Sequence, residues 1–190
     1  MAKTIAAVVG LLLLMPGGSF AAEESDAAWQ LLQQGGLVVL IRHSLAPGFG
    51  DPLGFRLEDC TTQRNLSEDG RRQAQAIGEA FRRRDVPIEK VYSSQWCRCR
   101  DTARFAFGFY LEHQALNSFF EQPALKNAQT AAMNSLLEEN RPLSGNLILV
   151  THQVNITALT GIVPASSEMV LARINEAGEL TVCARIAMIE

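Results

Sequence analysis

The sequence predicts an α/β protein in which helices cover both faces of a mostly parallel sheet, a three-layer α/β/α sandwich. Two short runs, 37–41 and 146–150, are apolar at every position except Asn146 and contain several β-branched residues, as central strands buried on both faces do. Amphipathic helical patterns alternate with such strands, which is the order of βαβ units. Two strand-like runs around a glycine turn near the C-terminus predict an antiparallel hairpin that finishes the sheet.

Each element follows from its periodicity and its end signals. A helix is expected over 24–33, because Gly35 and Gly36 end it before the first strand. Ser67 has the character of an N-cap, and acidic residues follow it where the helix dipole favours them. The other expected elements are a strand at 90–92, helices over 96–107, 127–140 and 154–160, and hairpin strands at 169–175 and 180–188. Residues 44–65 form a long loop, and such loops in compact domains are usually functional or disordered.

The first 21 residues have the pattern of an export signal. Lys3 precedes an apolar run over 5–15, a Pro-Gly-Gly break follows, and small residues suit cleavage after Ala21. A membrane-spanning helix needs about 20 apolar residues, and this run is much shorter. We therefore expect a signal peptide at 1–21, one domain at 22–190, a periplasmic or secreted location, and no stable membrane anchor after cleavage.

The charge of the chain is mildly acidic, with a net value of −3 that becomes one unit more negative without Lys3. Such a balance gives no electrostatic reason to bind nucleic acid, so any anion site must be local. An exported chain permits disulfides among its four cysteines, Cys60, Cys97, Cys99 and Cys183. Cys97 and Cys99 are too close to pair comfortably within one helix. The pairing stays open, with buried free thiols as the alternative.

Two of the three histidines directly follow the predicted central strands. Arg42-His43 comes after 37–41, and His152 comes one residue after 146–150. Ligand sites in open α/β sheets lie outside the carboxyl ends of the strands, so we expect both imidazoles in one crevice. Taken singly, either histidine could also bind loop carbonyls in a purely structural role. His113 follows no such strand and is expected to be a surface or structural histidine.

Four phrases of the sequence resemble the histidine phosphatase superfamily, which also contains the phosphoglycerate mutases. They are LIRH at 40–43, NLSEDGRRQA at 65–74, SSQWCRCRDTA at 93–103 and VTH at 150–152. Through these phrases, in this order, the resemblance extends over essentially all of the chain after the first segment. The resemblance implies that His43 is the phosphate-accepting nucleophile and that Arg42, Arg98 and His152 form the rest of the phosphate pocket.

The chemistry of these residue types supports the same roles. The charges of Arg42 and Arg98 should lower the pKa of His43 and keep its attacking nitrogen unprotonated. Guanidinium groups match phosphate oxygens and stabilise the charge that develops at phosphorus. A metal ion would be redundant in such a pocket, and we expect no cofactor. Arg64 is either a further phosphate contact or a cation that stabilises the loop, and Gln153 adds an amide to the pocket.

The proton donor to the leaving group is the open point of this site. In the mutase branch of the family it is a glutamate, and here Ser118 stands where a Leu-Asn-Glu pattern would have its acid. Glu121 is the candidate, Asp51 is the next, and a site without a strong acid is the third possibility. The acid phosphatase branch has His-Asp at the second histidine, and Gln153 disfavours that branch.

These observations predict an exported phosphatase that hydrolyses a small phosphorylated substrate, such as an envelope sugar phosphate or a scavenged phosphomonoester. The chain lacks the long insertions of mutases, which favours hydrolysis. The main alternative is a non-catalytic module that binds phosphate esters and has lost the general acid. A zinc hydrolase that uses His43 and His152 would leave Arg42 unexplained beside a dication. Nothing in the sequence predicts the oligomeric state.

Overall fold

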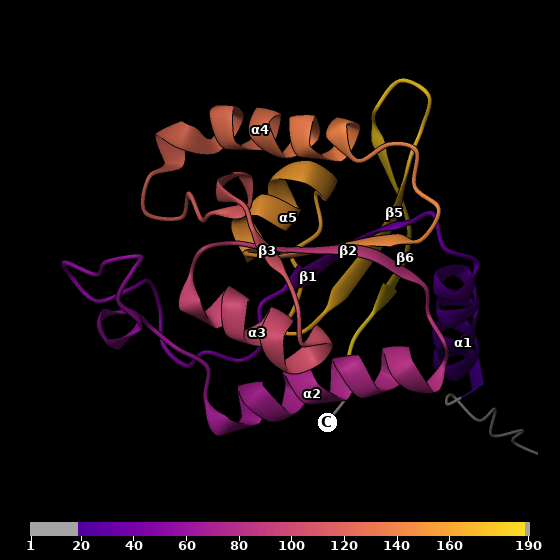
Figure 1. Ribbon diagram of the computed structural model, residues 1–190, viewed down its shortest axis with the longest axis horizontal. Coiled ribbons are helices and arrows are strands. Elements are labelled where there is room, and N and C mark those ends of the chain that lie inside the picture. Colours follow the sequence, from indigo (N-terminus) through magenta and orange to yellow (C-terminus); the bar gives the residue numbers. More distant parts are fainter. Residues whose placement is uncertain (1–18, 189–190) are drawn as a thin grey trace, which may run out of the picture.

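The computed structural model describes residues 19–188 and has the predicted three-layer architecture (Figure 1). One sheet contains six strands in the order β3-β2-β4-β1-β5-β6. These are β1 (Val38–Arg42), β2 (Ile88–Ser93), β3 (Leu111–Glu112), β4 (Asn146–Thr151), β5 (Met169–Ile174) and β6 (Leu180–Ile186). Strands β3, β2, β4 and β1 run parallel, and β5 and β6 are antiparallel to their neighbours. The predicted fold class, including the C-terminal hairpin, is confirmed.

The helices cover both faces of this sheet. They are α1 (Ser19–Gln34), α2 (Glu68–Arg83), α3 (Cys97–Phe107), α4 (Lys126–Glu139) and α5 (Gln153–Thr160). Figure 1 shows α2 and α3 on one side of the sheet, α4 and α5 on the other, and α1 near strand β6. Strand β3 and three short 3-10 helices, Cys60–Thr62, Gln114–Leu116 and Pro123–Leu125, are additions to the prediction. They are too short to show a hydrophobic period.

The side-chain alternation of β1 divides its residues between two cores. Val39 and Ile41 pack in the core beneath α1, α2 and α3. Val38 and Leu40 pack in the opposite core, beneath α4 and α5. Successive strand residues point to opposite faces, so a strand covered on both sides must be apolar at every position. This explains the continuous apolar run, and it makes β1 a rigid base for Arg42 and for the histidine that follows.

Close backbone contacts bring α2 and α3 together. The Ser67 hydroxyl accepts the backbone N–H of Gly70 at 3.1 Å, so the predicted N-cap is present. At Gly78 of α2, a Cβ would collide with the backbone of Ala106 in α3, and glycine alone permits this approach. The packing fixes α3, which carries Arg98, against the sheet.

The predicted signal peptide, 1–21, lies largely outside the described residues, which begin at Ser19 within α1. In the part of the chain that the structure describes, no helix has both the length and the apolar composition needed to cross a bilayer. Export and cleavage after Ala21 therefore stay predictions.

Candidate active site

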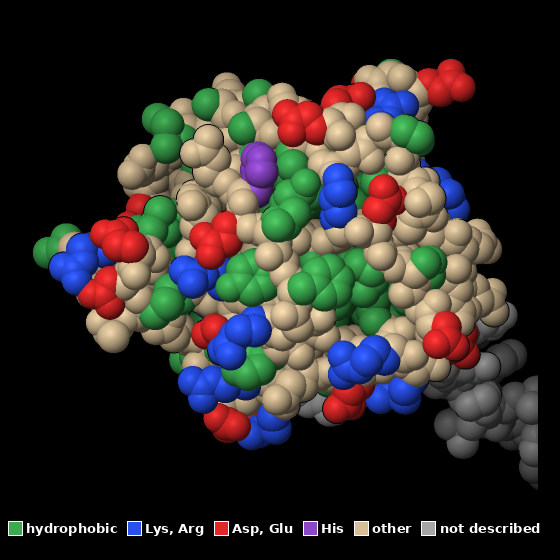
Figure 2. Space-filling view, viewed as in Figure 1, with side chains coloured by type: hydrophobic (Ala, Val, Ile, Leu, Met, Phe, Trp, Pro, Cys, Tyr) green, Lys and Arg blue, Asp and Glu red, His purple; other side chains and the backbone are tan. Residues whose placement is uncertain are grey.

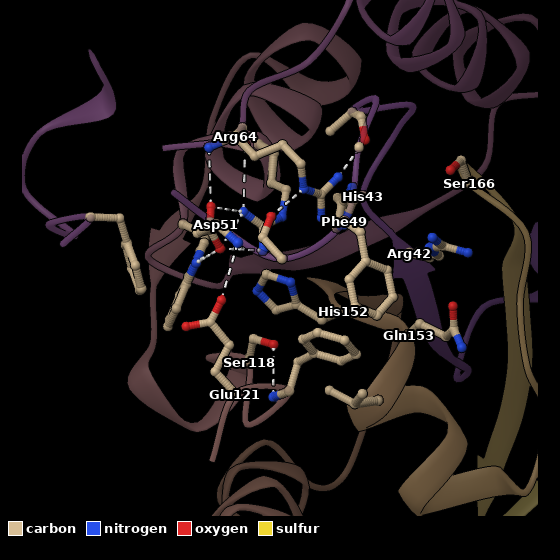
Figure 3. A pocket seen from close by; sticks show the side chains of 18 of the residues that line it. Arg42, His43, Phe49, Asp51, Arg64, Ser118, Glu121, His152, Gln153 and Ser166 are labelled. Atoms are coloured by element: carbon tan, nitrogen blue, oxygen red, sulfur yellow. Dashed lines mark hydrogen bonds and ion pairs between the residues drawn. The ribbon is translucent and has the colours of Figure 1, made fainter. Parts of the chain in front are cut away.

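The two histidines lie together at the carboxyl edge of the sheet. Strands β1 and β4 are adjacent and parallel, with Arg42 paired to Thr151, so His43 and His152 follow at the same level. Their ring centroids are 5.5 Å apart, in an edge-to-face arrangement. A cavity of about 350 Å³ opens above them (Figure 3). All seven residues that the sequence predicts for the site line this cavity: Arg42, His43, Arg64, Arg98, Glu121, His152 and Gln153.

The His43 ring is oriented by a backbone carbonyl. Its Nδ1 lies 2.8 Å from the carbonyl oxygen of Ser44, which only accepts hydrogen bonds, so Nδ1 carries the proton. In the neutral ring, Nε2 then holds a free lone pair. Burial lowers the pKa of His43 well below its usual value, and the charges of Arg98, Arg42 and Arg64 lower it further against the Ser44 bond. His43 is therefore neutral and suited to attack an electrophile.

The second histidine, His152, is held by polar and aromatic neighbours. Its Nε2 lies 2.9 Å from the hydroxyl of Ser94 and its ring meets that of Trp96 edge to face at 5.3 Å. Burial lowers the pKa of His152 well below its usual value, followed by the charge of Arg98. The nearby thiol of Cys99 has its pKa raised to about 12 by burial, so it stays protonated and is no nucleophile.

Arg98 forms a buried ion pair with Asp51 of the long loop. Both side chains are about 5% exposed, and Nη1 and Nη2 of Arg98 contact the carboxylate at 2.8 to 3.1 Å. Asp51 also accepts the indole N–H of Trp96 at 2.9 Å and the backbone N–H of Arg64 at 3.0 Å. Burial alone would raise the pKa of Asp51, but the bonds and charge of Arg98 bring it below its usual value. Asp51 is thus an ionised anchor for Arg98, which argues against its use as the proton donor.

Two arginine N–H groups at the cavity have no partner. The Nε atoms of Arg42 and Arg98 are buried and make no hydrogen bond within the described residues. Arg42 uses Nη1 to bind the carbonyl of Pro164 at 2.8 Å, and Arg98 uses its Nη atoms to bind Asp51. Both side chains line the cavity, so their guanidinium charges lie beside any anion that binds there.

Arg64 holds the loop over the site. Its Nε donates to the carbonyl of Gly50 at 2.7 Å, and its Nη1 donates to the carbonyl of Ala46. The loop-stabilising role that the sequence allows is therefore present. The side chain also lines the cavity, and its contact with phosphate stays a prediction.

The remaining predicted residues lie around the same cavity. Glu121 accepts the backbone N–H of Asp51 through Oε1 at 3.1 Å, which joins its segment to the long loop. Ser118 accepts the backbone N–H of Phe120 at 3.2 Å. Gln153 begins α5 and lies near Arg42 in the view of Figure 3. Among the described residues, Glu121 is therefore the carboxyl group lining the cavity that forms no ion pair with an arginine.

A disulfide joins the long loop to the helix that carries Arg98. Cys60 pairs with Cys97, with their Cα atoms 5.7 Å apart, and Cys97 directly precedes Arg98. This is the pairing that the sequence left open. Cys99 is a buried free thiol and Cys183 an exposed one.

Several polar partners of the site have no role in the sequence prediction. Ser94 binds His152, and Thr102 accepts the backbone N–H of Ser44 at 3.0 Å. Both lie within the phrase at 93–103, which is the signal that points to them. The structural role expected of His113 is observed, because its Nδ1 accepts the backbone N–H of Ala115 at 3.2 Å.

Comparisons with known proteins agree with this geometry. Residues 38–122 match the family model of the histidine phosphatase superfamily (branch 1). A search of curated protein sequences finds no significant match. Among solved structures, the protein histidine phosphatase SixA complexed with tungstate is similar, at 14% identity and a TM-score of 0.54, over 80% of this chain and 96% of that one.

Two further structures extend the comparison. Phosphoserine phosphatase from Entamoeba histolytica in complex with 3-phosphoglyceric acid is 14% identical with a TM-score of 0.56, over 80% of this chain and 97% of that one. A mycobacterial glucosyl-3-phosphoglycerate phosphatase complexed with VO3 is 17% identical with a TM-score of 0.56, over 78% and 97%. At these identities the likeness establishes the fold alone. The sequence match over residues 38–122 and the shared fold both relate the chain to the histidine phosphatase superfamily.

Proposed function

We propose that the protein is an exported phosphatase that hydrolyses phosphomonoesters through a phosphohistidine on His43. One observation carries the proposal. The free Nε2 of a buried, neutral His43 and the guanidinium groups of Arg42 and Arg98 belong to side chains lining one cavity. A nucleophile surrounded by fixed donors is the arrangement that phosphoryl transfer requires.

In the first step, the lone pair of His43 Nε2 attacks phosphorus, and the bond from phosphorus to the ester oxygen breaks. Negative charge spreads over the other phosphate oxygens, where Arg42 and Arg98 supply charged donors. The second histidine, His152, adds a polar group held in place by Ser94. Because the guanidinium of Arg98 is already fixed by Asp51, little reorganisation is needed during the reaction.

The leaving oxygen needs a proton, and Glu121 is the proposed donor. It lines the cavity, while Asp51 is committed to Arg98. In the second step, Glu121 takes a proton from water, the water oxygen bonds to phosphorus, and the bond between phosphorus and His43 Nε2 breaks. This restores the free enzyme and releases inorganic phosphate.

The proposed location is the periplasm or the exterior of the cell. The segment at 1–21 has the pattern of an export signal, and the Cys60–Cys97 disulfide is typical of an oxidising compartment. The substrate is then a small phosphomonoester, such as an envelope sugar phosphate or a scavenged ester. A cavity of about 350 Å³ suits a ligand of that size. Figure 2 shows acidic and basic side chains interspersed on one face, which gives no basic surface for nucleic acid there.

A second candidate function is a phosphate-ester-binding module without turnover. Ser118 occupies the position where the family pattern suggests an acid, and Glu121 already accepts a backbone N–H. If Glu121 cannot reach the leaving oxygen, the pocket would bind phosphate esters without cleaving them.

The test is hydrolysis of p-nitrophenyl phosphate by the wild type, with and without chelator, beside His43→Ala and the control His113→Ala. We expect turnover that resists chelator, vanishes in His43→Ala and persists in His113→Ala. Vanadate-induced shifts of the melting temperature report binding separately. No turnover together with a vanadate shift would favour the binding module, and chelator-sensitive turnover would contradict the metal-free mechanism.

A further inference from the structure

The rim of the cavity carries two exposed phenylalanines that the proposed chemistry does not use. Phe49 is 87% exposed and Phe120 is 41% exposed, and both line the cavity. Their rings meet edge to face with centroids 4.8 Å apart. Figure 3 shows the Phe49 side chain beside the cavity that His152 and Arg42 also line. Apolar surface exposed next to a polar site is typical of a place where the apolar part of a ligand binds.

The backbone is built to present Phe49. The glycines on either side of it, Gly48 and Gly50, have φ values of +99° and +64°, which L side chains rarely adopt. A Cβ on Gly50 would also come within 3.2 Å of the Glu121 carboxylate. Arg64 binds the Gly50 carbonyl at 2.7 Å. The exposed position of Phe49 is therefore set by the same contacts that hold the loop over the phosphate pocket.

Hydrogen bonds fix the segment of the second phenylalanine, Phe120, beside the segment of Phe49. Glu121, next to Phe120 in the chain, accepts the backbone N–H of Asp51 at 3.1 Å. Ser118 caps the backbone N–H of Phe120 at 3.2 Å. The first bond connects 49–51 with 118–121 and the second orders 118–120, so the two rings in contact form one wall.

Charge distinguishes this wall from the floor of the cavity. The cations that line the cavity are Arg42, Arg64 and Arg98, which surround the histidines and lower the pKa of His43. Two polar side chains adjoin this wall: Arg64 donates to the Gly50 carbonyl, and Glu121 accepts the backbone N–H of Asp51. An anionic leaving group that packs on these two rings would lose hydration and gain no hydrogen bond from them, so the rings disfavour it.

We propose that this wall, Phe49 with Phe120, selects phosphomonoesters whose leaving group is uncharged and presents a flat apolar face. The inference rests on the proposed phosphatase function and specifies its substrate class. The phosphoryl group lies against His43 and the arginines, and the leaving group packs on the exposed rings. An aromatic ring and the apolar face of a sugar ring both have this chemistry.

Binding of non-hydrolysable ligands tests the inference without turnover. Calorimetry compares phenylphosphonate, methylphosphonate and phosphonoacetate on the wild type, Phe49→Ala, Phe120→Ala and the control Phe109→Ala. Phe109 is 56% exposed but lies outside the cavity lining. We expect phenylphosphonate to bind the wild type about tenfold more tightly than methylphosphonate, and phosphonoacetate to bind most weakly. Phe49→Ala should remove most of the phenyl advantage, and Phe109→Ala should keep it.

A second experiment decides whether the leaving group is an aromatic ring or a sugar. It measures kcat/KM of the same variants for phenyl phosphate, glucose 1-phosphate and glycerol 1-phosphate. If Phe49→Ala lowers kcat/KM for phenyl phosphate, the wall binds an aromatic leaving group. If it lowers kcat/KM for glucose 1-phosphate, the wall binds a sugar. Glycerol 1-phosphate should be unaffected.

The two proposals fail in different ways. Equal binding of phenyl- and methylphosphonate, unchanged in Phe49→Ala and Phe120→Ala, would overturn the substrate class and leave the phosphatase function intact. Failure of every phosphonate and of vanadate to bind would overturn both.

Discussion

At the scale of single residues, folding buries the His43 side chain and places three arginines near it. Both changes disfavour its protonated form, so the pKa of His43 lies well below that of an exposed histidine. The Ser44 carbonyl then fixes which nitrogen carries the proton. Burial alone would make an inert histidine. Burial, a fixed tautomer and neighbouring guanidinium groups together supply what the proposed nucleophilic role of His43 requires.

The two buried histidines give the fold a defined pH dependence. Their pKa values in the folded protein lie well below the unfolded value of about 6.5. The unfolded chain therefore binds more protons below that pH, and the stability that is complete above it falls as the pH decreases. Each histidine contributes up to about 1.4 kcal/mol per pH unit in this window. Urea unfolding should give a smaller free energy at about pH 5.5 than at about pH 7.5.

The matched variant is His43→Asn combined with His152→Asn, which removes both titrating groups. Its free energy of unfolding should change less than that of the wild type over the same pH range. An equal change in both proteins would show that the two histidines are not the groups that titrate.

Asp51 is a positioning residue for Arg98 in this account. Asp51→Asn removes the charge that holds the guanidinium, and we expect kcat/KM for p-nitrophenyl phosphate to fall about 10- to 100-fold. Vanadate should also bind the folded variant more weakly, and a loss of stability alone would not change that affinity. The control is Asp59→Asn, because Asp59 pairs with Arg56 in the same loop but at its exposed surface. Equal activity of the two variants would contradict the positioning role.

At the scale of elements, the predictable parts are those with a long hydrophobic period or a clear end signal. Helix α2 is predicted from Ser67 and its apolar face, and it begins one residue later. Strands β1 and β4 are predicted from continuous apolar runs because both of their faces are buried. Strand β3 consists of two exposed residues, Leu111 and Glu112, and is defined by pairing with β2 alone. No local pattern reports such a long-range contact.

The disulfide is the covalent tie between the long loop and α3. Cys60 and Cys97 are separated by 37 residues, and loop closure of that length stabilises the fold by about 4 kcal/mol through the unfolded state. The Cys60→Ala, Cys97→Ala double variant should lose stability of this order in urea unfolding. Cys183→Ser, at an exposed free thiol, is the control and should change it by less than about 0.5 kcal/mol. A double variant as stable as the wild type would show that the loop is held by its hydrogen bonds alone.

At the scale of the whole molecule, the sequence predicts only part of the candidate site. His43 and His152 are predictable because parallel strands end at one edge and the topology brings their ends together. Asp51 is a candidate proton donor in the sequence, and nothing in the sequence indicates that it pairs with Arg98. The path of the long loop depends on Arg64, the disulfide and positive-φ glycines acting together, and none of these leaves a periodic signal.

The aromatic rim has no sequence signal for the same reason. Phe49 and Phe120 are 71 positions apart in the printed sequence and meet because the loop folds back over the cavity. Each phenylalanine alone has the appearance of an ordinary core residue. Its exposure becomes visible only when the whole fold is assembled.

The central claim is that a phosphoryl group is carried on His43. The most direct measurement is to mix the enzyme with substrate, quench with alkali within the first turnovers, and map the phosphorylated peptide by mass spectrometry. The account predicts one phosphoryl group on His43, stable to alkali and labile to acid, and absent from His43→Ala. Full turnover without a phosphorylated His43, or a phosphoryl group on another residue, would contradict it.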